Sequence, residues 1–342
     1  MHFHHKGQNY SCHCRYCRCT RTIKMNDTVL QEPDFVLDCR IDSDKKSLTA
    51  AALAFIYLTI LFGNFLVILV ILLNHQLQTP MFFYVGALSV VDIVNSSTLI
   101  PQMICALLLK GSVVPNHVCL MLNAIVGYME VLVCLILALM AYDRYVAVLN
   151  PLRYPSIITN KTVFAVLLLF NGIGIIGEIP FIIFAKELPF CNIDVLPFCY
   201  CEYATMVRIA CTDDPKYLLS LFLVTVVLGT GPLTMILFSY GKIAHAVLKI
   251  PSSEGKSKLY NTCVTQLLVI GTQFGPLMIY YMLPATGIEF STAEYNTMFL
   301  LSNAIPPMLN PIIYSFRNQE IKKSISKLFT GKRTVAQIGA KK

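Results

Sequence analysis

The sequence predicts an all-α membrane protein, a bundle of seven transmembrane helices followed by a short amphipathic helix. Its 342 residues are 56% hydrophobic and only 13% charged, whereas a soluble domain carries about a quarter charged residues. Seven apolar stretches are long enough to cross a bilayer as a helix, which takes about 20 residues. They lie at roughly 48–73, 81–108, 118–142, 163–185, 217–240, 262–284 and 297–316.

Strands do not fit these stretches. A transmembrane strand alternates polar and apolar residues over about ten positions, and the seven stretches are apolar throughout. Backbone groups in hydrocarbon must form hydrogen bonds within the protein, so helices are the structure that remains.

The chain divides into three parts. Residues 1–47 are predicted to be an extracellular arm, 48–316 the seven-helix domain, and 317–342 a cytoplasmic amphipathic helix and tail. Residues 1–24 hold a C-x-C-x2-C-x-C cluster that is not a standard zinc pattern. We interpret them as a disordered leader or an upstream extension of the reading frame. Asn26 begins an N-glycosylation sequon on the arm.

Charge predicts the orientation in the membrane. Lys and Arg gather after the third, fifth and seventh stretches, at 144–161, 242–258 and 317–342, whereas acidic residues gather on the opposite side. By the positive-inside rule the C-terminus is cytoplasmic and the N-terminus extracellular. The net charge of +8 therefore indicates contact with membrane lipid and not with nucleic acid. We expect a multi-pass protein of the plasma membrane.

Polar residues within the stretches are candidates for function, since ionisable groups in a span are costly and usually face the protein interior. Asp92 lies in the second stretch, and Asn64 and Asn310 could reach the same depth. We expect an interior polar cluster there. It is either a site for water or a cation such as sodium at Asp92, or a purely structural hydrogen-bond network.

Two glutamates lie nearer the outer side. Glu130 precedes Arg144 by fourteen residues, or about 21 Å along a helix, which places it where a small molecule could enter. Glu178 lies in the outer half of the fourth stretch and is the weaker candidate.

Several motifs together resemble an odorant receptor, a rhodopsin-like (class A) G-protein-coupled receptor. DRY or NPxxY alone would indicate only class A, but the longer motifs are far more specific. The resemblance covers about residues 25–330. It rests on GN in the first stretch, PMFFYVGALSVVD in the second, MAYDRYVAV ending the third, SY in the fifth and PMLNPIIYSFRN in the seventh.

The resemblance implies an activation switch at the cytoplasmic end. In such receptors the arginine matching Arg144 is held by the acid matching Asp143 at rest and is released on activation to receive the G protein. Without the resemblance, Arg144 would be interpreted as a snorkelling arginine paired with its neighbour. The implied switch residues are Asp143, Arg144, Tyr145, Tyr240, Asn310, Pro311 and Tyr314.

The resemblance also implies a ligand pocket between the outer halves of spans three, five, six and seven. Most of its positions are apolar with a few polar anchors, as is usual for a small-molecule site. The family often carries an acid where Val133 stands here, three residues after Glu130. We hypothesise that Glu130 favours ligands with an amine or hydroxyl donor. The implied pocket residues are Val126, Glu130, Val131, Val224, Leu228, Phe274, Leu277, Tyr281 and Asn303.

The long outer loop, at about 186–216, carries four cysteines whose pairing the sequence alone leaves open. The resemblance implies two disulfides, Cys119–Cys201 and Cys191–Cys211. Cys199 is then left over, and its state is open.

The resemblance implies a receptor without a cofactor. It would bind a small, largely apolar odorant and activate the olfactory stimulatory heterotrimeric G protein, which raises cyclic AMP. An enzyme is not expected, because His75, His117 and His245 lie in loops or at span ends and suggest no buried nucleophile–base pair. A transporter would be expected to show repeats and paired broken spans. The sequence shows neither, so a transporter is not expected. The remaining alternative is a non-olfactory class A receptor for another small ligand.

Overall fold

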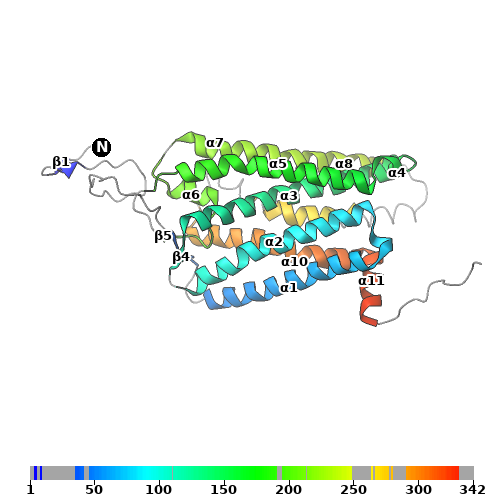
Figure 1. Cartoon of the computed structure of the whole chain (residues 1–342), viewed down its shortest axis with the longest axis horizontal. Coiled ribbons are helices and arrows are strands. Elements are labelled where there is room, and N and C mark those ends of the chain that lie inside the picture. The colour runs from blue at the N-terminus through cyan, green and yellow to red at the C-terminus, as the bar shows by residue number, and fades with distance from the viewer. Residues whose placement is uncertain are drawn as a thin grey trace, which may run out of the picture.

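A computed structural model shows the chain as a bundle of long helices lying side by side (Figure 1). The residues it describes are 4–5, 8–9, 35–41, 46–109, 111–190, 195–212, 214–248, 263–264, 266–276, 279 and 290–330. Asn26, Cys191, Leu277, Tyr281 and the tail from 331 lie outside these residues.

Within the described residues, five helices are long and apolar enough to cross a membrane. The fifth is made of two α-helices joined by the π-helical turn η3. These spans are α1 (Lys46–Leu73), α2 (Pro80–Leu108), α3 (Asn116–Leu149), α5 (Asn160–Glu187) and α7 (Pro215–Val224) with η3 (Thr225–Thr230) and α8 (Gly231–Leu248).

The sixth and seventh members of the bundle are residues 266–276, which are helical, and α10 (Thr292–Arg317). The α10 helix packs against α1 and α2. The prediction of a helical membrane bundle is therefore confirmed. Several helix ends lie outside the predicted stretches. The α8 helix continues beyond residue 240 to Leu248, and α10 begins at Thr292 and not at 297. The α3 helix continues beyond residue 142 to Leu149, so Asp143 and Arg144 lie inside the helix.

Shorter helices lie between the long ones or, in the case of α11, follow the last of them. They are η2 (His75–Leu77), α4 (Tyr154–Ile157), α6 (Tyr203–Ile209) and α11 (Gln319–Thr330). The α11 helix turns away from α10 at the end of the bundle opposite the N-terminus (Figure 1). It buries Ile321 and exposes Lys322, as an amphipathic helix at a membrane surface does.

Strands appear at the outer end. β1 (His4–His5) pairs with β2 (Gln8–Asn9). β3 (Phe35–Leu37) is the central strand of a second sheet, antiparallel to β4 (Ser112–Val114) and parallel to β5 (Val195–Leu196). At β3 the N-terminal arm thus pairs with the loops that hold β4 and β5.

Large apolar side chains remain exposed along the outside of the bundle. Phe55 and Phe62 of α1 are 71% and 66% exposed, and Phe164 of α5 is 69% exposed. A water-facing surface of this kind would promote association, whereas lipid accepts it. The apolar exterior is what a membrane-spanning bundle requires.

Candidate functional site

A cavity lies in the outer half of the bundle, between α3, α5, the fifth span and α10. It encloses about 830 Å³ unfilled by protein atoms, its open mouth included. Five of the residues that the resemblance assigns to the pocket line it, namely Val126, Glu130, Val131, Val224 and Leu228. The structure thus gathers residues from two spans around one space.

The other assigned residues do not line this cavity in the described part of the chain. Phe274 is buried in the apolar cluster of the cytoplasmic half. Asn303 is buried and donates a 3.1 Å hydrogen bond to the carbonyl of Phe299 in its own helix. Leu277 and Tyr281 lie outside the described residues.

The outer loop folds inward as the roof of the cavity. Tyr200 is almost fully buried and stacks on Phe299 of α10, with the ring centroids 5.8 Å apart. The backbone N–H of Tyr203 donates to Oδ1 of Asn123 in α3 at 2.9 Å, and its ring packs on Phe181 of α5. The roof therefore contacts three spans at once.

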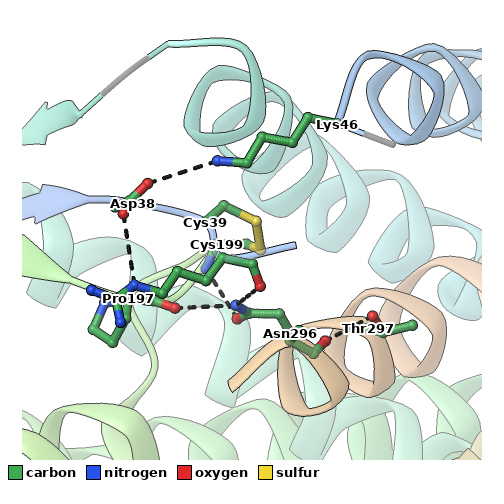
Figure 2. Close-up of a disulfide and its surroundings, with 9 residues drawn as sticks. Asp38, Cys39, Lys46, Pro197, Cys199, Asn296 and Thr297 are labelled. Atoms are coloured by element: carbon green, nitrogen blue, oxygen red, sulfur yellow. Dashed lines mark hydrogen bonds and ion pairs between the residues drawn. A yellow bond between two sulfur atoms is a disulfide. The ribbon is translucent and has the colours of Figure 1, made fainter. Parts of the chain in front are cut away.

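Two disulfides in the described residues hold this roof. Cys119–Cys201 joins the start of α3 to the loop, the pair that the resemblance implies. Cys39–Cys199 joins the extracellular arm to the loop (Figure 2). The state of Cys199, which the sequence leaves open, is thus a bond to the arm.

Asn296 at the outer end of α10 secures the same junction (Figure 2). Its Nδ2 donates to the carbonyls of Arg40 and Pro197, at 3.2 and 3.1 Å, and its Oδ1 accepts from the N–H of Cys199. The arm, the loop and α10 are therefore joined through one side chain.

The interior polar cluster is formed in part. Nδ2 of Asn310 donates to Oδ2 of Asp92 at 2.9 Å, and both residues are buried. Asn64 is buried nearby, but its Nδ2 donates to the carbonyls of Ile60 and Pro307 and not to Asp92. Within the described residues, no group of three His, Cys, Asp or Glu side chains could hold a metal ion.

The predicted cytoplasmic switch is an ion pair within α3. Nη2 of Arg144 lies 2.8 Å from Oδ2 of Asp143, and its Nε donates to the same oxygen. Asp143 is fully buried, and its other oxygen accepts a 2.9 Å hydrogen bond from Tyr154 of α4. Burial and the neighbouring Asp143 raise the pKa of Tyr154 to about 12, so its hydroxyl stays protonated and keeps donating.

The three tyrosines of the predicted switch, Tyr145, Tyr240 and Tyr314, belong to one apolar cluster. The hydroxyl of Tyr240 donates to Oε1 of Gln266. Tyr145 packs near Phe238 of α8. Tyr314 is buried, and its hydroxyl has no partner among the described residues.

Sequence reasoning missed Cys39, Tyr200 and Glu202 and ranked Glu178 too low for a residue that lines the cavity. Parity could have found Cys39: the outer loop and the start of α3 together carry an odd number of cysteines, and the arm after Met25 carries one. The place of Glu178 depends on the rotation of α5, which the sequence does not reveal.

The comparisons with known proteins agree on one family. Residues 53–332 match the family model described as olfactory receptor. The chain is 32% identical to human olfactory receptor 13C9, over 89% of this chain and 96% of that protein. It is 34% identical to human olfactory receptor 2S2, over 81% and 88%. It is 30% identical to the rat olfactory receptor-like protein I9, over 91% and 98%. The chain therefore belongs to the olfactory receptor family, whose members are non-enzymatic G-protein-coupled receptors of the membrane.

Proposed function

We propose that this receptor binds a small, largely apolar odorant in the outer cavity and activates a stimulatory heterotrimeric G protein of the olfactory type, raising cyclic AMP. The observation that carries the proposal is that one helix links the two sites. The α3 helix lines the cavity with Val126 and Glu130 and carries the Asp143–Arg144 pair at its inner end. Glu130 and Arg144 are about 21 Å apart along it.

The ligand acts through differential affinity. It shifts the equilibrium toward the active state only as far as it binds that state more tightly. In the active state Arg144 leaves Asp143 and faces the G protein. Tyr145, Tyr240 and Tyr314, with Asn310 and Pro311 in α10, complete the switch. The proposed pocket extends beyond the described cavity to Phe274, Leu277, Tyr281 and Asn303.

The placement in the membrane is part of the proposal. The arm and the disulfide-bonded loop face the outside of the plasma membrane, and α11 faces the cytosol. Asn26 is proposed to be glycosylated. Cys211 is disulfide-bonded in the structure, which supports the proposed pair with Cys191.

A cell assay tests the proposal. The chain started at Met25 is expressed with an olfactory stimulatory G protein, and cyclic AMP is measured against a panel of odorants. We expect a concentration-dependent rise that Arg144→Ala abolishes at equal surface level. Val131→Phe, which fills the cavity, is expected to weaken the response. Leu168→Phe, on the exposed side of α5, is the matched control. A surface-expressed receptor that no volatile activates would contradict the proposal.

A further inference from the structure

The carboxylate of Glu178 is buried in the cavity wall without a protein partner. The residue is 5% exposed and lines the cavity from α5. Within the described residues, no hydrogen bond or ion pair reaches its carboxylate. Its oxygens lie against Gly127 of α3, where a Cβ atom would stand only 2.7 and 2.8 Å from them. The missing side chain at Gly127 is what lets the carboxylate approach α3.

The other polar groups of the cavity are mainly acceptors as well. Glu130 follows Gly127 by three residues, about 4.5 Å deeper along α3. Glu202 lines the cavity from the roof, as does Tyr200, whose buried hydroxyl has no partner among the described residues. Burial raises the pKa of the Tyr200 hydroxyl well above its ordinary value, and the charges of Glu130 and Glu202 raise it further. The negative charges of Glu130 and Glu202 are therefore both felt at the Tyr200 hydroxyl in the roof.

The described wall of the cavity carries no basic side chain. None of the described residues that line the cavity is Lys, Arg or His. The seven predicted spans, including the parts that the structure does not describe, contain no Lys, Arg or His in their sequence. Glu178 also borders a separate groove on the surface of the bundle, and two basic residues, His117 and Lys186, line that groove. Lys186 is eight residues further along α5, about 12 Å away along the helix axis.

A charged carboxylate that is buried without a partner is costly in a medium of low dielectric constant. A bound cation that also donates hydrogen bonds removes that cost, and charge-assisted hydrogen bonds are roughly twice as strong as neutral ones. An alkyl ammonium group supplies both the charge and the donors. Its apolar chain suits the rest of the wall, which includes Val131, Val224 and Leu228.

We infer that the cavity binds a small aliphatic amine in its protonated form, with the ammonium group held between Glu178 and Glu130. This inference rests on the proposed function, because it takes the cavity to be the odorant site. It adds the chemical class of the ligand, and it makes Glu178 of the fourth span the main anchor.

The experiment uses primary alkyl amines of about four to eight carbons, each paired with the alcohol, aldehyde and carboxylic acid of the same length. The receptor started at Met25 is assayed for cyclic AMP at constant pH near 7, where an alkyl amine carries its proton as lysine does. We expect amines to act at concentrations at least about tenfold lower than the matched alcohols, a difference of about 1.4 kcal/mol.

Two substitutions locate the anchor. Glu178→Gln is expected to raise the half-maximal amine concentration at least about tenfold and to change that of the matched alcohol by less than about threefold. Gly127→Ala keeps the charge of Glu178 but pushes its carboxylate away, so it should weaken the amine response selectively. The control is Glu187→Gln on the same helix, at a carboxylate that is 50% exposed and paired with Lys216. It should leave both responses unchanged.

The outcomes distinguish failure of the amine inference from failure of the proposed receptor function. Amines no more potent than their matched compounds, or a full amine response in Glu178→Gln, would overturn the amine inference while leaving an odorant receptor for another class. If Glu178→Gln does not reach the cell surface, Gly127→Ala and Glu130→Gln decide, and unchanged amine potency in both overturns the inference. If no probe and no odorant of any class raises cyclic AMP, the proposed function itself fails.

Discussion

The outer and cytoplasmic ends of the bundle are held together in different ways. At the outer end, two described disulfides and a three-stranded sheet join the arm, the loop and the start of α3. At the opposite end, the described polar contacts are non-covalent and include an ion pair and single hydrogen bonds, such as those from Tyr154 to Asp143 and from Tyr240 to Gln266. Covalent bonds keep one set of partners, whereas polar contacts can be exchanged for others.

This difference suits the two tasks of a receptor. A pocket that is formed before the ligand arrives loses less entropy on binding. A switch needs two arrangements of similar free energy, which contacts of about 1 kcal/mol each allow. The following experiments test this contrast, from the largest expected effect to the smallest.

Removing the disulfide between α3 and the loop should have the largest effect. Cys119→Ser is expected to abolish nearly all surface expression and all odorant response, because loss of a native disulfide typically costs 2–5 kcal/mol. Surface labelling and cyclic AMP measure the two effects. Cys105→Ser is the matched control, since Cys105 is a free, exposed cysteine. Normal surface levels in Cys119→Ser would show that the outer end does not depend on this bond.

Removing the bond between the arm and the loop should have a smaller effect. Cys39→Ser is expected to lower the unfolding temperature of the purified receptor by several degrees, because β3 and Asn296 still hold the arm. Cys39→Ser combined with Cys199→Ser should behave like either single variant, since all three lack the same bond. Additive losses would show that the two cysteines act separately.

Weakening the cytoplasmic switch should change signalling more than stability. Tyr154→Phe removes one hydrogen bond to Asp143, about 1 kcal/mol, and should raise ligand-independent cyclic AMP by up to about fivefold at equal surface level. The matched control is Tyr142→Phe, because no described hydrogen bond involves the Tyr142 hydroxyl. Lower basal signalling in Tyr154→Phe would show that Tyr154 favours the active state instead.

The smallest effect is expected where α11 meets the bundle. Ser324→Ala removes the hydrogen bond that its Oγ accepts from Asn74 at 2.6 Å. Because such a contact contributes about 1 kcal/mol or less, the maximal cyclic AMP response should fall by less than about twofold. Lys323→Ala, at an exposed position of the same helix, is the control. Complete loss of G-protein coupling in Ser324→Ala would show that the contact between α11 and the bundle matters far more than one hydrogen bond suggests.

The helical bundle could be predicted from sequence because lipid imposes one rule on every span. Apolar length identifies the spans, and backbone hydrogen bonding makes them helices. The predicted third span stops at 142, before the charges of Asp143 and Arg144, whereas α3 ends at Leu149. In the structure the two charges neutralise each other inside the helix, so they do not end it.

The residues of the candidate site could be predicted only where they lie in or near a recognisable sequence motif. The motif around Arg144 identifies the ion pair, the distance along the same helix places Glu130, and the resemblance assigns Val126 and Val131 to the pocket. Glu178 and Phe274 depend on how neighbouring helices are rotated and packed. Gly127, which admits the Glu178 carboxylate, carries no sequence signal that distinguishes it from a glycine tolerated in a span.

The bond between Cys39 and Cys199 has a consequence for biosynthesis. The two cysteines are 160 residues apart in sequence, so in the orientation proposed above Cys39 reaches the oxidising lumen long before its partner during synthesis. Until then its thiol is open to wrong partners, among them Cys12, Cys14, Cys17 and Cys19 if the first 24 residues are translated. A chain started at Met25 carries no other cysteine in its arm, and it should therefore mature with fewer mispaired products.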